Sequence, residues 1–406
     1  MEDIFLFQQA LLQMIYYLVF GLWFIWAMAK QIDVSALKDR IVLMLLMFFC
    51  LEVVSSLVTS GFGAIALLSD YAYSNIREQA VSLVMFLLAA SLCKNKQGVI
   101  NIIHVIFTGS LVVMGIGCLE KMIGYNIFST KGVTPFTAIM STYMDQSFLG
   151  RYLMFLILLF LPFVIFDGWN KTVSLFTTIS AAILLIFTRS VSGLLSLGVG
   201  LFMLILQSKY YLKKTAENYR KPKFAWSMFV FVVLIVLAIT SQPEMIKSVN
   251  EYFMSAAFKL GTFQSSARYN MDMTALEMFK KNPLFGVGFG NYPKYFNEYN
   301  QRINVWGLGG EPIIHNSLLS VAAELGIVGL IFILYFYGYF IKIALFDARK
   351  IKDDFMRKAQ LSLGIIWIVM IVNSWVYFKF FEDPKIWFAM GLAYAIRRNY
   401  LDEKED

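Results

Sequence analysis

The chain has 406 residues, of which 59% are hydrophobic and only 15% are charged. A single water-exposed globule cannot bury this much apolar surface, so the composition excludes an ordinary soluble protein and predicts a polytopic membrane protein. The formal net charge is +8, and we expect the basic segments to mark the cytoplasmic side and to contact anionic lipids rather than to bind nucleic acid.

The chain begins with "MEDIFLFQQALLQ", which has acidic residues in place of a basic leader and no small-residue cleavage site. We therefore expect a retained first span rather than a signal peptide. A membrane-crossing helix needs about 20 apolar residues. Runs of suitable length predict spans at 8–29, 41–60, 79–93, 99–119, 149–166, 172–188, 190–206, 224–241, 316–341, 361–380 and 385–396. The predicted fold class is an all-α polytopic membrane protein with about 11–12 transmembrane helices and a large helical extracytoplasmic loop.

Alternate crossings place the basic segments at 209–223, at 347–358 and in the C-terminal tail on one side, which the excess of Lys and Arg identifies as cytoplasmic. The N-terminus is then outside. A twelfth or re-entrant segment near 61–75 would instead place it inside. Three parts follow from this pattern: an N-terminal transmembrane bundle of about eight spans (1–241), a large extracytoplasmic loop (242–314), and C-terminal transmembrane helices with a cytoplasmic tail (315–406).

The large loop is the expected seat of function, because long loops held by a rigid scaffold commonly carry it. Its first half has helical spacing with mixed charge, which is typical of amphipathic helices at the membrane interface. "NPLFGVGFGNY" then breaks the pattern with Gly286, Gly288 and Gly290. No strand precedes these glycines, so a dinucleotide-binding turn is not predicted. A tight turn that approaches another element or a ligand is the expected structure. The aromatic residues that follow, among them Tyr292, either stack on sugars or anchor the interface.

Chemistry that needs metal or disulfides has little support in this sequence. The three cysteines, Cys50, Cys93 and Cys118, lie in or near apolar runs without metal-ligand spacing. We expect packing roles for them. No metal and no cofactor is predicted.

Three motifs occur in order around the loop. Arg189 stands in "TRSVSGLLSL" at a span boundary, Arg268 stands in "SSARYNMDMTALEMFKK", and His315 opens "HNSLLSVAAELGIVGL". The last motif has His, a small polar residue, nine residues and then Gly-x-x-Gly. These motifs resemble those of the O-antigen ligase and O-antigen polymerase superfamily over residues 186–338. The usual Thr after the second Gly is Leu330 here.

The resemblance implies a metal-independent glycosyltransferase at the outer face of the bacterial inner membrane, with its active site facing the periplasm. Members of this family transfer an oligosaccharide from undecaprenyl diphosphate to an acceptor hydroxyl. The acceptor is the next lipid-linked repeat unit for a polymerase and lipid A-core for a ligase. A chain-length regulator protein and membrane lipids are further expected partners.

The residue types suit this chemistry. Guanidinium groups such as Arg189 and Arg268 can stabilise a departing diphosphate without metal. His315 can accept the proton of an attacking hydroxyl. Asn316 either caps the following helix or orients His315. Arg302 is a further candidate for phosphate binding, as are Lys280 and Lys281 in the same loop.

The helix that follows His315 is predicted to be continuous. In that helix Glu324 would point away from His315 and pair within the bundle. Gly326 and Gly329, one turn apart, would make a close contact with a neighbouring helix.

Other functions remain open at this stage. Leu330 in place of Thr and the "HNSLL" form favour the polymerase over the ligase. A transporter or flippase for a lipid-linked glycan would also use many spans and buried arginines. It would place ionisable groups near the bilayer midplane in repeated halves, whereas most candidates here lie at the outer edge and no repeat is found.

Overall fold

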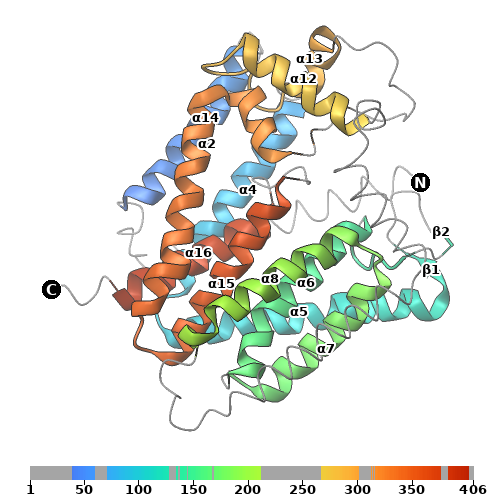
Figure 1. Cartoon of the computed structure of the whole chain (residues 1–406), viewed down its shortest axis with the longest axis vertical. Helices are drawn as coiled ribbons and strands as arrows, with labels where there is room; N and C mark the ends of the chain where they lie inside the picture. The colour runs from blue at the N-terminus through green and yellow to red at the C-terminus, as the bar shows by residue number, and fades with distance from the viewer. Residues whose placement is uncertain are drawn as a thin grey trace, which may run out of the picture.

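The computed structural model describes residues 39–59, 71–127, 134–135, 138–143, 145–166, 169–211, 267–300, 312, 314, 316–375 and 383–401 (Figure 1). Regular structure in these residues is helical apart from one antiparallel pair of two-residue strands, β1 (Tyr125–Asn126) and β2 (Thr134–Pro135). The predicted all-α membrane fold is confirmed.

Nine helices coincide with predicted spans: α2 (Arg40–Thr59), α4 (Tyr71–Leu92), α5 (Lys96–Ile123), α6 (Gln146–Ile165), α7 (Lys171–Phe187), α8 (Val191–Tyr211), α14 (Ser317–Ile341), α15 (Asp354–Asn373) and α16 (Pro384–Leu401). Among the described helices, six are long and apolar enough to cross a membrane, and α7 and α8 are shorter apolar helices. The predicted spans at 8–29 and 224–241 lie outside the described residues.

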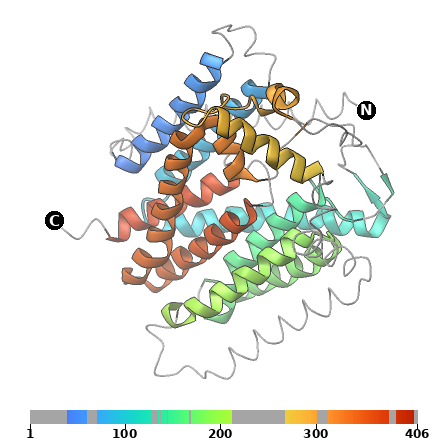
Figure 2. The same cartoon turned by 45° about the horizontal axis from the view of Figure 1, so that its top comes forward.

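Two short helices of the large loop, α12 (Ala267–Lys281) and α13 (Tyr292–Tyr299), lie across one end of the bundle (Figures 1 and 2). We call this the loop end. It also holds the end of α2, because Asn291 Nδ2 donates to Thr59 Oγ1 at 2.6 Å. The start of α4 lies here too, since Gly290 packs against Ala72. The chain therefore leaves α2 and enters α4 at the same end. Most of the segment near 61–75, where a twelfth or re-entrant span was considered, lies outside the described residues.

The opposite end, called here the basic end, gathers cationic segments from three parts of the chain. Lys96 at the start of α5 pairs with Asp353 before α15 at 2.9 Å. At the far end of α16, Arg397 pairs with Asp347 at 3.0 Å. Consecutive described spans consequently run in alternating directions, and the predicted gathering of 347–358 with the start of the C-terminal tail at one end is confirmed. That this end faces the cytoplasm stays a prediction.

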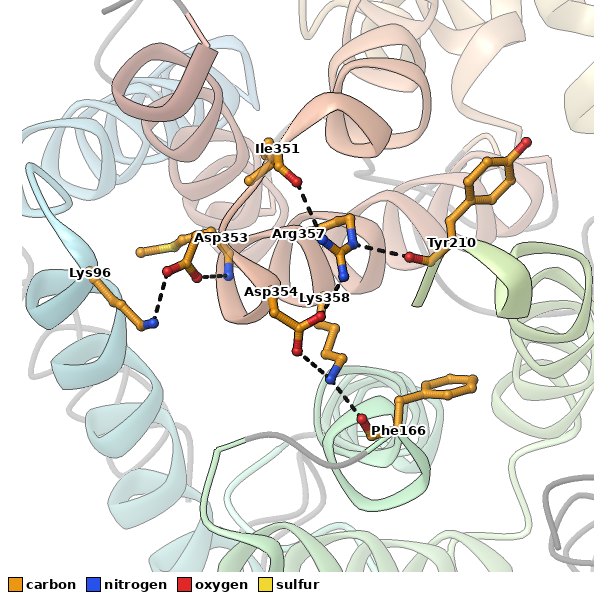
Figure 3. Close-up of polar contacts among 9 residues, drawn as sticks. Lys96, Phe166, Tyr210, Ile351, Asp353, Asp354, Arg357 and Lys358 are labelled. Carbon is orange, nitrogen blue, oxygen red and sulfur yellow. Dashed lines mark hydrogen bonds and ion pairs between the residues drawn. The ribbon is translucent and has the colours of Figure 1, made fainter. Parts of the chain in front are cut away.

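A buried charge cluster holds the basic end together (Figure 3). Asp354 forms ion pairs with both Arg357 and Lys358, which are only 3% and 2% exposed. Lys358 Nζ donates to the carbonyl of Phe166 at 2.7 Å, and Arg357 Nε donates to the carbonyl of Tyr210 at 3.1 Å. Both acceptors lie at the C-terminal ends of helices, where cations are favoured. These two cations thus join α15 to α6 and α8, and the expectation that they contact anionic lipid is wrong because they are buried.

The first and last parts of the chain share one core. Helix α16 packs along α4, and α15 packs along α6 and α8. The ring of Phe86 in α4 meets those of Trp387 and Phe340 edge-on at 6.4 Å and 6.3 Å. Gly391 permits this approach, because a Cβ there would overlap the carbonyl of Phe86. The core of the bundle is therefore assembled from segments on both sides of the large loop.

Candidate functional site

The helix predicted to follow His315 is broken. Gly326 has φ 64° and ψ −156°, which divides α14 into an outer piece, 317–325, and an inner piece, 327–341. The prediction of a continuous helix is wrong at this position. A break at membrane depth is tolerated only where other protein groups satisfy the released backbone N–H and C=O groups.

The glycine-containing loop supplies those groups. The N–H groups of Val287 and Gly288 donate to the carbonyls of Ala323 and Glu324, each at 2.9 Å. In return the N–H of Ile327 donates to the Pro283 carbonyl at 2.8 Å. The loop at 282–291 is thus hydrogen-bonded into the break of α14, and the two form one unit.

Glycine is required on both sides of this contact. Gly286 and Gly326 both have left-handed φ, at 65° and 64°. A Cβ on Gly286 would lie 2.5 Å from the Ala323 carbonyl oxygen, and a Cβ on Gly326 would overlap the backbone of Leu284. The predicted tight turn with close backbone approach is confirmed, and the element it approaches is α14. Gly326 was expected to make a close contact with a neighbouring spanning helix. Its close contact is instead with this loop.

Glu324 ties the same loop to α14 through its side chain. This carboxylate is 6% exposed, and its Oε1 accepts a hydrogen bond from the N–H of Tyr292 at 3.1 Å. Tyr292 is itself buried, and its hydroxyl donates to the Met271 carbonyl in α12 at 2.8 Å. Burial, with the nearby charges of Asp272 and Glu324, raises the pKa of Tyr292 far above its ordinary value. Glu324 and Tyr292 therefore lock α12, α13 and α14 together.

Gly288 occupies the side of the loop that faces α2. Its φ is 96°, and a Cβ would overlap the hydroxyl of Thr59. Gly288 contacts Thr59, and Tyr292 contacts Glu324 and Met271, so both residues are parts of the scaffold. Their predicted roles in substrate binding stay predictions.

Asn316 is the N-cap of α14. Its side-chain oxygen accepts hydrogen bonds from the N–H groups of Leu318 and Leu319, each at 3.1 Å. The next residue, Ser317, donates its N–H to the Ser374 carbonyl at the end of α15 at 2.9 Å. The backbone directly after His315 is thus fixed at the loop end by two helices. His315 and Arg302 themselves lie outside the described residues.

Arg189 lies in the turn that joins α7 to α8. Its φ of 53° is uncommon for a residue with a side chain, and such a conformation costs about 1–2 kcal/mol. The turn is held by Thr188, whose Oγ1 donates to the Leu185 carbonyl at 2.7 Å and accepts from the Ser190 N–H at 3.2 Å. Ser190 Oγ in turn accepts from the Gly193 N–H at 3.1 Å and caps α8. The outcome is an exposed arginine side chain at a strained, well-braced turn, which is a frequent feature of functional sites.

Arg268 occupies the first turn of α12, and α12 packs against α14. The two lysines at the other end of α12 are engaged within the protein: Lys280 pairs with Glu277 at 2.8 Å, and Lys281 lies 4.9 Å from the ring centre of Tyr299. Among the predicted catalytic positions, the structure places the turn of Arg189, the backbone of Arg268 and the cap that follows His315 at the loop end.

One structural feature of this end was missed in the sequence. Glu120, fully buried in the last turn of α5, accepts hydrogen bonds from the N–H groups of Ile127, Met140 and Ser141 at 2.8–2.9 Å. Glu120 thereby ties Ile127, Met140 and Ser141, which follow α5 in the sequence, to the end of this helix. An acidic residue at the end of an apolar run was the available signal, since a buried carboxylate needs several donors.

These features define a multi-pass helical membrane protein with a polar site built over a broken helix at one end of the bundle. Residues 175–334, which include Arg189, the loop and the broken helix, match the family model described as O-antigen ligase. The chain is also 27% identical over 270 residues to a curated O-antigen ligase of Salmonella typhimurium, an alignment that covers 64% of this chain and 59% of that protein. The predicted family resemblance is confirmed, and the aligned part spans about three fifths of the relative's length.

Proposed function

We propose that this protein is a glycosyltransferase that moves an oligosaccharide from undecaprenyl diphosphate to an acceptor hydroxyl at the periplasmic face of the inner membrane. The observation that carries the proposal is the match over residues 175–334, which covers the predicted arginine at the α7–α8 turn, the α12 arginine and the capped start of α14. In this proposal the loop end faces the periplasm.

In the proposed transfer, His315 and the two arginines have different roles. His315 accepts the proton as the acceptor oxygen attacks the anomeric carbon. The bond from that carbon to the diphosphate oxygen breaks, and the negative charge that develops on the diphosphate is stabilised by Arg189 and Arg268. A single displacement of this kind inverts the anomeric configuration. The fixed cap at Asn316 and the loop–helix lock around Glu324 fix described backbone next to these motifs.

Two acceptors are supported by different observations. Leu330, where the ligase pattern has Thr, favours a polymerase whose acceptor is another lipid-linked repeat unit. The similarity to an O-antigen ligase of Salmonella typhimurium favours a ligase whose acceptor is lipid A-core. The donor and the residues that act on it are the same in both cases.

The test uses purified protein in lipid nanodiscs with undecaprenyl diphosphate-linked repeat units, with and without lipid A-core, and resolves product lengths on a gel. A ladder from the donor alone identifies a polymerase, and a conjugate formed only with lipid A-core identifies a ligase. His315→Ala and Arg268→Ala should each lower the rate at least 100-fold.

Matched controls are available at positions outside the site. His104→Ala removes the other histidine, which is exposed on α5, and Lys294→Ala removes an exposed cation on α13. Both should keep the wild-type rate. If folded, monodisperse wild-type protein shows no turnover with the donor alone and none with lipid A-core added, the glycosyltransferase proposal is refuted. Transport of the lipid-linked glycan is then favoured.

A further inference from the structure

Asn373, the last residue of α15, is a buried amide whose hydrogen-bonding groups the described part of the fold does not use. Its side chain is 4% exposed, and neither Oδ1 nor Nδ2 has a hydrogen-bond partner among the described residues. Because both atoms are unbonded, exchanging the oxygen and the nitrogen of the amide does not remove the deficit. Buried polar groups are nearly always hydrogen-bonded, so this amide requires an explanation.

Other buried amides of the described chain show the contrast. Gln360, also on α15, donates its Nε2 to the carbonyls of Ile343 and Ala393 at 3.2 Å and 2.9 Å. Gln79 resembles Asn373 in having both side-chain atoms unbonded within the described residues, but it lies in the interior of α4. Asn373 instead ends its helix, next to a residue that holds the start of α14. Its position therefore relates this amide to the candidate site.

Ser374, the residue after Asn373, is bonded to α14 twice. Its carbonyl accepts the N–H of Ser317 at 2.9 Å, and its Oγ lies 3.2 Å from the hydroxyl oxygen of Tyr337. Ser317 is two residues after His315 in the sequence. Asn373 consequently adjoins the backbone that carries the histidine motif, although it lies outside that motif.

The same segment is bordered on another side by α12. Met271 of α12 packs in one apolar cluster with Ile314 and Leu319, which stand before and after His315 in the sequence. Asn270, the neighbour of Met271, is 4% exposed, and its Oδ1 also has no hydrogen-bond partner among the described residues. Two elements that contact the segment at 314–319 thus each carry a buried asparagine with unused hydrogen-bonding capacity.

The chemistry of an amide defines the ligand that can satisfy Asn373. Its Oδ1 accepts and its Nδ2 donates, so a matching ligand must supply both a donor and an acceptor. An ionised diphosphate supplies acceptors only, and a hydrocarbon chain supplies neither. Sugar hydroxyls supply both, and two neighbouring hydroxyls on one ring match the two atoms of the amide. The unused groups therefore favour a sugar over the other parts of a lipid-linked glycan.

We propose that the Asn373 amide binds hydroxyl groups of the glycan substrate beside the histidine motif and contributes to the choice of sugar. This inference rests on the proposed function, because that function supplies the glycan. The hydroxyls belong either to the donor glycan or to the acceptor, since both carry sugars. A site built to hydrogen-bond a hydroxyl discriminates strongly against a substrate without it, because its buried polar groups are then left unbonded.

The test measures binding without turnover, by native mass spectrometry of protein released from nanodiscs. Three ligands are titrated separately: the undecaprenyl diphosphate-linked repeat unit, undecaprenyl diphosphate without sugar, and lipid A-core. Asn373→Leu keeps a branched side chain and removes both polar atoms, and Asn373→Ala removes them without added bulk. Each variant should weaken binding of a sugar-bearing ligand about 10-fold and leave binding of undecaprenyl diphosphate unchanged. Asn101→Leu, the same substitution at an exposed position of α5, should bind as wild type.

The pattern of losses identifies the source of the hydroxyls. A loss confined to the lipid-linked repeat unit assigns them to the donor glycan, and a loss confined to lipid A-core assigns them to the acceptor. Wild-type binding of both sugar-bearing ligands by both Asn373 variants overturns the inference. Equal weakening of undecaprenyl diphosphate with and without sugar overturns it too, because the amide would then not act on the sugar.

Thermal unfolding separates a substrate-binding amide from one that bonds a structural water. An amide whose partner is the substrate does not stabilise the protein without glycan, so Asn373→Leu should leave Tm unchanged or raise it. A lower Tm in both variants, with weaker binding of all three ligands, would identify a structural water only and overturn the inference. A sugar-specific loss of binding in protein that fails the transfer assay would uphold this site and reject only the proposed reaction.

Discussion

Gly286 lies against the backbone of Glu324, at the point where the loop at 282–291 closes the break in α14. The contact leaves no room for a side chain, since the nearest backbone atoms of α14 occupy the position of a Cβ. Two segments about 40 positions apart in the sequence therefore depend on each other: the loop satisfies the broken helix, and the helix gives the loop its hydrogen-bonding partners.

This dependence makes Gly286→Ala a severe change. The left-handed φ of 65° and the overlap with α14 should together lower the free energy of unfolding by about 2–4 kcal/mol, because the loop must leave the break. Thermal unfolding in detergent, followed by size-exclusion chromatography, should show a clear fall in Tm together with lost glycan transfer. Gly115→Ala on α5 is the control, since a Cβ there meets nothing within 4 Å. Equal Tm values for the two variants would contradict the loop–helix lock.

A rescue experiment can establish whether Asn316 acts as a helix cap or contacts substrate. If it acts as the cap of α14, Asn316→Ala costs about 1 kcal/mol and displaces His315, whereas Asn316→Asp and Asn316→Ser retain a side-chain acceptor for the Leu318 and Leu319 N–H groups. We expect both polar variants to recover most of the transfer rate lost in the alanine variant. Failure of Asp and Ser to recover the rate while Tm returns to normal would show that the amide itself contacts substrate.

Asp354 is the carboxylate shared by two buried cations at the basic end. Asp354→Asn leaves two buried cations, Arg357 and Lys358, without their shared carboxylate, so we expect a loss of about 3 kcal/mol. This is the low end for buried pairs because Asp354 is itself 40% exposed. Glu277→Gln breaks an exposed pair of the same i,i+3 spacing on α12 and should change stability by less than about 0.5 kcal/mol. Denaturant titration of both variants in the same detergent makes the comparison, and similar losses would argue against a structural role for the cluster.

Asp353 should give the basic end a weak acid sensitivity. Partial burial acts to raise the pKa of this carboxyl, but hydrogen bonds from the Met356 N–H and from Lys96, with the lysine charge, lower it overall. A lowered folded-state pKa stabilises the protein above the unfolded value of about 4, and this contribution is lost as pH falls through the folded pKa.

Asp353→Asn keeps a side-chain acceptor for the cap of α15 but cannot titrate. The difference in Tm between wild type and this variant should be small and constant from pH 7 to pH 5, and should shrink below about pH 4. Partial exposure of both partners limits the effect to under about 1 kcal/mol. A difference that grows as pH falls would mean that the folded-state pKa is raised instead.

The membrane spans and their directions could be predicted from the sequence because they depend on local properties. Apolar runs of about twenty residues and short basic loops can be recognised in a sequence without knowing which segments pack against them. Every described spanning helix overlaps a predicted run. Arg189, Arg268 and Asn316 were singled out through the family resemblance of their motifs, whereas the glycine turn was predicted from Asn-Pro and three alternating glycines. The structure places the turn of Arg189 and the cap of α14 at one end of the bundle.

Contacts between distant segments could not be predicted in this way. The Gly-x-x-Gly pair suggested a packed helix, whereas Gly326 marks a break whose energy is acceptable only because Pro283, Val287 and Gly288 supply hydrogen-bonding partners. The burial of Arg357 and Lys358 depends on the carbonyls of Phe166 and Tyr210, which belong to other helices. By itself, then, the sequence determined the class of protein and the described spans, because apolar length is a local property, and the resemblance of its motifs suggested the candidate chemistry. Tertiary structure alone decided the broken helix and the buried charge cluster, because each is stabilised by groups far away along the chain.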